Sequence, residues 1–385
     1  MVRKKLGSVV LGLALSVSLA ACGGEGAGSG TDSAGSGGGG GDGEQTIGVS
    51  MPTQTSERWI ADGRAVKEGL EKEGFTVDLQ YANDDIPTQS QQIDQMITRG
   101  ADALIVAAID GTALSGQLQN AADSDIPVIS YDRLIRDTEN VDFYVSFDNE
   151  EVGRQQATSL LAGLGVLNAD GSEGSEKGPF NIELFAGSLD DNNAHFFWSG
   201  AMEVIEPAIE AGTVVVKSGQ TSIEKAAILR WQQETAQKRM EDLLTSSYSG
   251  ADVVNGVLSP YDGISRGIIT ALQNRGYGGA DRPMPIVTGQ DAEIASVKLI
   301  ADGVQYSTIF KDTRKLAEQS IVAAQAFLEG EEPEANDTET YDNGTKVVPS
   351  YLLDLETVTK DNIQSVLVDS EYYTAEEVKT GQAAG

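Results

Sequence analysis

The chain of 385 residues has very few side chains of the kinds that bind metals or form disulfides. It contains one cysteine, Cys22, and one histidine, His195. A disulfide within one chain needs two cysteines, and zinc sites are built mainly from several cysteine and histidine side chains. We therefore expect no internal disulfide, no metal site and no cofactor. A single histidine also leaves little choice of groups for acid–base catalysis near neutral pH.

Basic side chains are scarce as well. Lysine and arginine together number 27 against 59 aspartates and glutamates, which gives a net charge of -32. Proteins bind nucleic acid largely by neutralising phosphates with lysine and arginine, so this composition excludes a nucleic-acid partner. The acidic residues are spread along the chain, and we interpret them as a solvated surface that keeps the protein soluble. After residue 44, no apolar run is long enough to span a membrane.

The first residues have the pattern of an export signal. Three basic residues at positions 3–5 precede a mostly apolar run at 6–21, which is short for a membrane span. The run ends in Leu19-Ala20-Ala21-Cys22, which resembles the bacterial lipobox. That resemblance implies cleavage before Cys22 and a diacylglycerol on its sulfur. The alternative is an ordinary cleavable signal followed by a chance cysteine.

A glycine-rich segment follows Cys22. Residues 23–43 are 21 in number, 12 of them are glycine, and none has an apolar side chain larger than alanine. Such a segment cannot bury a core, so we expect residues 22–44 to be a flexible tether with a reach of roughly 25 Å. Residues 1–21 would then be a lipoprotein signal peptide. The exported protein would be anchored by lipid to the outer face of the cell membrane.

The remaining residues alternate between short apolar strands and helical patterns. About 340 residues are enough for two domains. Helical spacing is clear over residues 57–73 and 88–99, and short, nearly all-apolar strands between helices indicate a parallel sheet covered on both faces. The expected strands are Thr46–Met51, Thr76–Tyr81, Ala103–Ala107, Pro127–Tyr131 and Phe143–Phe147, then Phe180–Phe185, Thr213–Lys217, Val253–Leu258, Pro285–Thr288 and Ser307–Phe310. Ten strands are too many for one such sheet, so the sequence predicts an α/β protein of two doubly wound domains.

We place the boundary between the domains near Asp148. The tail after Gly330 contains the extended segment Lys346–Leu353, which we interpret as chain that crosses back between the domains. The first lobe is then predicted to comprise residues 45–148 and about 311–343. The second lobe would comprise 149–310 and about 344–385. Ligands of open α/β sheets bind beyond the carboxyl ends of the strands, so we expect a binding cleft between the lobes.

Polar and aromatic side chains follow six of the expected strands. Those that we single out as a candidate site are Arg58, Asp132, Arg133, Asp191, Asn193, Asp291 and Lys311, with Trp59 and Trp231 as aromatic walls. Phe196, Phe197 and Trp198 are further aromatic candidates that could instead only pack the domain. Any one polar residue of this set could be a helix cap or a turn residue, and Trp231 could equally belong to the core.

Sugar recognition is the chemistry that suits this set. A sugar hydroxyl both donates and accepts hydrogen bonds, and planar groups such as carboxylate, amide and guanidinium can engage two neighbouring hydroxyls at once. The C–H faces of a pyranose pack well against flat aromatic rings.

The chain closely resembles the periplasmic monosaccharide-binding proteins of bacterial ABC importers, and among these the multiple-sugar-binding receptors and the xylose-binding proteins. The likeness extends from Ile47 to about Tyr373. The stretches that carry it include Met51-Pro52-Thr53, Arg58-Trp59, Tyr131–Arg136, Phe147-Asp148-Asn149, Gly178–Phe185, Asp190–Ala194, Leu258–Gly263, Gly289–Ala292 and Tyr306–Thr313.

The resemblance implies a monomeric two-domain receptor of the periplasmic binding protein type I, with a three-stranded hinge. It implies that the nine candidate residues contact the sugar and that Tyr261 belongs with them. Many sugar receptors have asparagine where this chain has Tyr261, before Asp262. His195 stands where the multiple-sugar-binding receptor has an aromatic residue. The expected function is to capture an extracytoplasmic aldose or uronic acid and to deliver it to an ABC permease.

Two other classes of function fit the sequence less well. A glycosidase could use Asp132 and Asp191 as paired carboxylates, but the sequence shows no nucleophile–base constellation. A repressor of the same fold needs a basic helix-turn-helix at the amino end, where this chain has its signal and tether. A second role of the receptor, presenting sugar to a sensor, stays open, as does the identity of the sugar.

Overall fold

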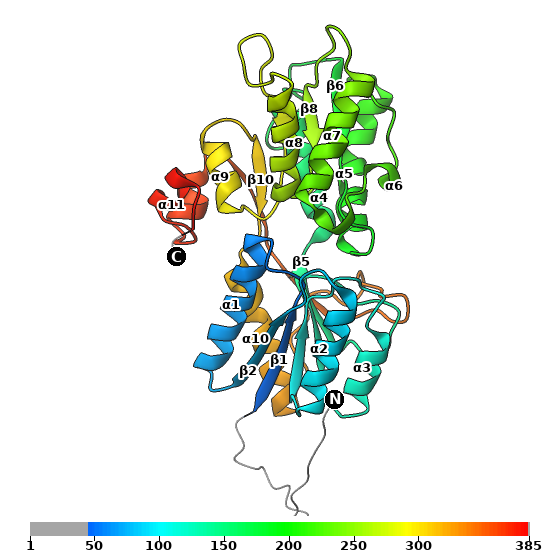
Figure 1. Ribbon diagram of the computed structural model, residues 1–385, viewed down its shortest axis with the longest axis vertical. Coiled ribbons are helices and arrows are strands. Elements are labelled where there is room, and N and C mark those ends of the chain that lie inside the picture. The colour runs from blue at the N-terminus through cyan, green and yellow to red at the C-terminus, as the bar shows by residue number, and fades with distance from the viewer. Residues whose placement is uncertain (1–44, 384–385) are drawn as a thin grey trace, which may run out of the picture. The chain divides into compact units, whose positions relative to one another are not determined.

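The computed structural model describes residues 45–383. The predicted signal peptide, Cys22 and the tether lie outside the described residues. Two α/β lobes are formed, each around its own sheet (Figure 1). Among the described residues, no helix combines the length and the apolar character that a membrane crossing requires.

The first lobe is a six-stranded parallel sheet of order β11-β5-β4-β3-β1-β2. Its strands are β1 (Thr46–Met51), β2 (Thr76–Tyr81), β3 (Ala103–Val106), β4 (Val128–Tyr131), β5 (Phe143–Phe147) and β11 (Ser350–Leu353). Its helices are α1 (Glu57–Lys72), α2 (Ile86–Thr98), α3 (Ser115–Ala122) and α10 (Thr313–Glu329). The order 2-1-3-4-5 is that of a doubly wound fold, in which ligands bind at the switch point beside the first strand.

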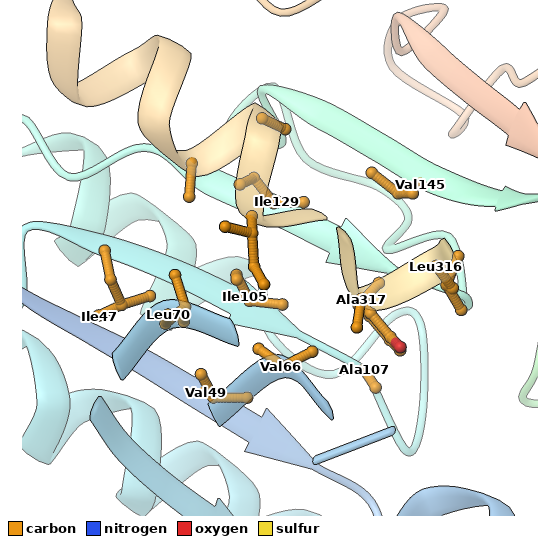
Figure 2. Close-up of a cluster of buried hydrophobic side chains, with 14 of the residues drawn as sticks. Ile47, Val49, Val66, Leu70, Ile105, Ala107, Ile129, Val145, Leu316 and Ala317 are labelled. Atoms are coloured by element: carbon orange, nitrogen blue, oxygen red, sulfur yellow. The ribbon is translucent and has the colours of Figure 1, made fainter. Parts of the chain in front are cut away.

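Helices cover both faces of this sheet. The apolar face of α1, with Val66 and Leu70, packs with Leu316 of α10 on one side of the strands, as Figure 2 shows. On the other side, α2 and α3 contribute Met96 and Leu118. The strands are buried on both faces, which explains why their sequences are almost continuously apolar rather than alternating.

The second lobe repeats the same winding in a four-stranded parallel sheet of order β7-β6-β8-β9. Its strands are β6 (Phe180–Leu184), β7 (Val214–Val216), β8 (Gly256–Leu258) and β9 (Ile286–Val287), and an antiparallel pair is formed by β10 (Ser307–Phe310) and β12 (Glu356–Thr359). Its helices are α4 (Asn149–Gly163), α5 (Asn193–Glu210), α6 (Ile223–Ala226), α7 (Gln233–Ser247), α8 (Asp262–Asn274), α9 (Ile294–Ala301) and α11 (Ala375–Thr380), with short turns at Leu229–Trp231 and Gln364–Val368.

All ten strands expected from the sequence are present, some of them shorter than predicted. The chain passes between the lobes after β5, after β10 and between β11 and β12, and Asp148 caps α4 at the first of these passages. The predicted lobe boundary in the tail is wrong. Strand β11 pairs with β5, so residues 350–353 belong to the first sheet, and the chain enters the second lobe only at β12. The sequence shows an extended segment there but not the strand with which it pairs.

Helices α4 and α5 approach each other through glycine. A Cβ on Gly153 would lie 2.1 Å from the backbone oxygen of Phe197, and a Cβ on Gly200 would lie 2.0 Å from that of Glu150. The helices therefore touch backbone to backbone, and this contact fixes the start of α5, which leads from the candidate site into the second lobe.

We predict that Gly153→Ala lowers the stability of the protein by about 1–3 kcal/mol, because its methyl group has no room. The matched change Gly116→Ala in α3, where nothing lies within 4 Å, should raise stability by about 0.5–1 kcal/mol through helix propensity. Urea denaturation of both variants checks this. A Gly153→Ala variant that is as stable as the unaltered protein would contradict the close contact between α4 and α5.

Candidate functional site

A cavity of about 520 Å³ lies between the carboxyl ends of the strands of the two lobes. The structure brings all ten residues predicted as sugar contacts to its lining: Arg58, Trp59, Asp132, Arg133, Asp191, Asn193, Trp231, Tyr261, Asp291 and Lys311. The first lobe contributes residues that follow β1 and β4, and the second lobe contributes residues that follow β6, β8 and β9, with Trp231 in the turn Leu229–Trp231 and Lys311 directly after β10. The placement follows from the rule that parallel strands present their carboxyl ends at one edge.

A buried ion network crosses the cavity from one lobe to the other. Arg58 donates to Asp132, to Asp62 (Nε–Oδ2 2.9 Å) and, across the lobes, to Asp291 (Nη1–Oδ1 3.4 Å). Lys311 lies 3.1 Å from Asp291 and 3.7 Å from Asp132. All five side chains are buried. Charges removed from water are tolerated only when they are paired, so each lobe depends on the other to satisfy this network.

Two carboxylates of the network, Asp132 and Asp62, have pKa values shifted in opposite directions. Burial alone would raise the pKa of Asp132, but Arg58 and Lys311 lower it to about 2. Asp62 shares Arg58 with two other carboxylates and accepts from Tyr131, and burial raises its pKa to about 6. Asp132 is therefore ionised and available to accept hydrogen bonds, whereas Asp62 lies behind Arg58 and holds it in place.

The backbone at the strand ends aims two of the carboxylates. Asp132 and Asp291 have φ of 59° and 87°, in the left-handed region that most residues avoid. Arg230 and Trp231 also have positive φ, at 55° and 57°. Such backbone persists only where surrounding contacts enforce it, and it is typical of ligand sites.

Aromatic rings form the walls of the cavity. Two guanidinium groups lie over the Trp59 ring, with the Arg58 and Arg133 Cζ atoms 4.8 Å and 5.0 Å from its centroid. Trp231 makes edge contacts with the rings of Phe197 and Tyr261, at centroid distances of 6.3 Å and 6.2 Å. These flat apolar surfaces flank the charged floor.

Outside the ion network, four of the predicted contact residues have polar groups that are already engaged by protein. Asn193 donates to the backbone oxygen of Asp132 (2.7 Å) and accepts from the hydroxyl of Tyr144 (3.1 Å). The hydroxyl of Tyr261 donates to Glu293 (2.7 Å). At the rim of the cavity, Arg133 pairs with Asp191 across the lobes at 3.0 Å. These groups therefore hold the site together.

Of the three further aromatic candidates and His195, one residue lines the cavity. Phe197 lines the cavity, whereas Phe196 packs on Tyr341 and Trp198 packs in the core of the second lobe. His195 is exposed on α5, outside the cavity lining.

Sequence reasoning missed several residues of the lining, among them Thr53, Thr55, Ser56, Asp84, Asp190, Arg230, Gln232, Arg266 and Gln290. It also missed Asp62, which supports Arg58 from one helical turn away. The spacing i, i+4 of Arg58 and Asp62 was the available signal for an ion pair on a helix. Within residues 45–383, no group of three or more histidine, cysteine, aspartate or glutamate residues is arranged to hold a metal ion.

A family model described as a periplasmic binding protein domain matches residues 47–332. The chain belongs to the periplasmic binding protein family. Its doubly wound α/β lobes are those of the type I fold, as the sequence predicted. The family consists of solute-binding receptors, so the protein is a receptor and not an enzyme. This excludes the glycosidase alternative.

Individual periplasmic binding proteins resemble the chain over most of its length. It is 54% identical to the multiple sugar-binding periplasmic receptor ChvE of Rhizobium radiobacter, over 87% of this chain and 92% of that protein. It is 34% identical to the D-xylose-binding periplasmic protein of Escherichia coli, over 87% and 93%. A solved structure of an ABC transporter solute-binding protein from Clostridium phytofermentans with bound β-D-glucose is 41% identical, covers 87% of this chain and 100% of its own, and has a TM-score of 0.81.

The raised pKa of Asp62 gives a testable pH dependence. The folded protein holds this proton more tightly than the unfolded chain, whose aspartate pKa is about 3.9, so folding stability falls as pH rises from about 4 to 6. Two pKa units correspond to about 3 kcal/mol. Asp62→Asn has no such proton to lose. We therefore expect its free energy of unfolding, relative to that of the unaltered protein, to rise by about 3 kcal/mol between about pH 4 and 6, measured by urea denaturation at several pH values. An unchanged difference across the range would contradict the assignment.

Proposed function

We propose that this protein is a lipid-anchored receptor outside the cytoplasm that captures a monosaccharide between its lobes and delivers it to an ABC importer. The observation that carries the proposal is the cavity itself. It combines the ionised carboxylate of Asp132, the charged groups of Asp291 and Lys311, and aromatic walls. These groups lie near the strand ends of two facing lobes. This is the arrangement that suits a small ligand with many hydroxyls and apolar C–H faces.

The relatives support an aldose as the ligand class. The protein from Rhizobium radiobacter is named a multiple sugar-binding receptor, the Clostridium phytofermentans structure holds β-D-glucose, and the Escherichia coli protein is named for D-xylose. The sequence left a uronic acid open because Arg58, Arg133 and Lys311 form a positive group. Each of these cations already faces a carboxylate in the cavity, Asp132, Asp191 or Asp291. That balance favours a neutral aldose.

Specificity would come from the buried polar groups. Asp132 is ionised and accepts from sugar hydroxyls, while Arg58 and Lys311 donate. A sugar epimer that leaves one of these groups without a partner loses about 1–3 kcal/mol. Trp59 and Trp231 are the rings against which the pyranose would pack.

Capture would use closure of the lobes. Arg58, Asp132 and Trp59 belong to the first lobe, and Asp291 and Trp231 to the second, so a sugar contacts all of them only when the lobes are together. A ligand that binds the closed form better shifts the population toward it.

Export and anchoring rest on the amino-terminal sequence. The Leu-Ala-Ala-Cys ending favours lipid attachment at Cys22, and the glycine-rich segment after it would let the lobes turn freely near the membrane. The solved relative is a solute-binding protein of an ABC transporter, which favours a permease as the partner, and we propose that the receptor acts as a monomer.

The proposal predicts a thermal shift with one or a few aldoses. A ligand that binds only the folded form at a thousand times its Kd stabilises by about 4 kcal/mol. A screen of aldoses and uronic acids against protein shown to be folded and free of carried-over sugar measures this. A folded protein that responds to no sugar would refute the ligand class.

The variant Asp132→Asn should weaken binding of the best sugar at least tenfold, because it removes a charged hydrogen-bond acceptor from the floor. Asp302→Asn, an exposed aspartate at the end of α9, is the control and should bind normally. Calorimetric titration of the two folded variants decides this, and equal affinities would exclude Asp132 from the site.

Replacing the anchor residue tests the location. We expect Cys22→Ser to release the protein from the membrane fraction into the soluble exported fraction, because no sulfur remains for the lipid. Detergent phase partitioning of cell fractions checks this, and a protein that stays with the membrane after the change would refute anchoring at Cys22.

A further inference from the structure

Two helices from opposite lobes meet at their amino-terminal ends beside the cavity. Ser56 precedes α1 in the first lobe, and Glu293 precedes α9 in the second lobe. The Ser56 hydroxyl donates to Oε1 of Glu293 at 2.7 Å. Serine at this position usually caps its own helix. Within the described residues, the Ser56 side chain makes no such capping bond, and its hydroxyl is used across the lobes instead.

A second carboxylate lies at the same junction. Glu57, the first residue of α1, lies near Ile294, the first residue of α9, across the lobes. The amino end of each helix therefore faces a carboxylate that belongs to the other lobe. Free N–H groups and the helix dipole make such ends favourable places for negative charge.

Glu293 is held in place by its own lobe. Its side chain is 1% exposed, and it accepts from the Tyr261 hydroxyl (2.7 Å) and from Arg266 (Nη2–Oε2 2.6 Å). Its backbone N–H donates to Asp262 at 2.9 Å. The carboxylate is thus preorganised as an acceptor, and Ser56 completes its set of donors only when the lobes are together.

We infer that the Ser56–Glu293 hydrogen bond forms an interlobe latch that sets the lifetime of the closed receptor without selecting among sugars. The inference rests on the proposed function. Ser56 and Tyr261 line the cavity, but both hydroxyls are bound to Glu293. The latch bond joins protein to protein, so it strengthens the closed form by the same factor for every sugar. Tyr261 acts through Glu293 as a positioning residue.

The test is the dissociation rate of two sugars from Ser56→Ala. A hydrogen bond to a charged group accounts for about tenfold or more in an equilibrium constant. We expect the rate of sugar release to rise about tenfold, with an unchanged association rate and an unchanged ratio of affinities for D-glucose and D-galactose. Stopped-flow measurement of tryptophan fluorescence reports both rates, because Trp59 and Trp231 line the cavity.

Two further variants separate the latch from general destabilisation. Ser56→Thr keeps the hydroxyl and should keep the slow release. Asp85→Ala removes the side-chain cap of α2, where Asp85 accepts from Thr88 at 2.9 Å, and it should lower stability without changing release. In a Glu293→Gln background, Ser56→Ala should have a smaller effect than in the unaltered protein, because the charged acceptor is gone.

The outcomes are distinct from those that test the proposed function. An unchanged release rate in Ser56→Ala overturns the latch, and a changed ratio of sugar affinities shows that the hydroxyl contacts sugar, which also overturns it. If the unaltered protein binds no sugar, the proposed function fails, and the latch is judged by small-angle scattering without ligand. Ser56→Ala should then be less compact than the unaltered protein, and equal dimensions would overturn the latch.

Discussion

Arg58 has to satisfy more negative charge than it carries. It faces Asp62 and Asp132 from its own lobe and Asp291 from the other, with Lys311 as the second cation of the group. Two cations face three buried carboxylates, and burial, with a smaller contribution from the neighbouring Asp132 and Asp291, raises the pKa of Asp62. A buried charge without partners costs several kcal/mol, so this network favours the arrangement of lobes that completes it. The cavity, its polarity and the approach of the lobes all depend on this constraint.

The order of the strands is enough to bring these charged residues together. Both sheets are wound in the same order, so their strands end at facing edges, and the residues just after each strand become the floor of the cavity. Left-handed backbone at Asp132 and Asp291 then turns two carboxylates inward at the points where their strands stop. Strain of this kind is tolerated because the strands on either side are fully buried and fixed.

Much of this arrangement is predictable from the sequence because it is local. Apolar strands and polar strand ends are visible residue by residue, so the ten strands and ten of the residues that line the cavity could be anticipated. Pairing is not local, and the sequence of β11 shows that a segment is extended but not that β5 is its neighbour. Asp62 and Glu293 were missed for a related reason. Neither residue lines the cavity, and each acts through a residue that does: Asp62 through Arg58 on the same helix, and Glu293 through Ser56 of the other lobe.

The positions of these groups separate two tasks that a receptor must perform. Under the proposed function, Asp132 and Lys311 would contact sugar hydroxyls whose positions differ from one sugar to another, so they would discriminate among sugars. The contact between Ser56 and Glu293 is between protein atoms, so its contribution is common to every ligand that allows closure. A receptor built in this way can change its affinity by changes at α1 and α9 while its choice of sugar stays with the floor. On the same proposal, Tyr261 can stand where asparagine is frequent because its hydroxyl donates to Glu293 and would not be needed by the ligand.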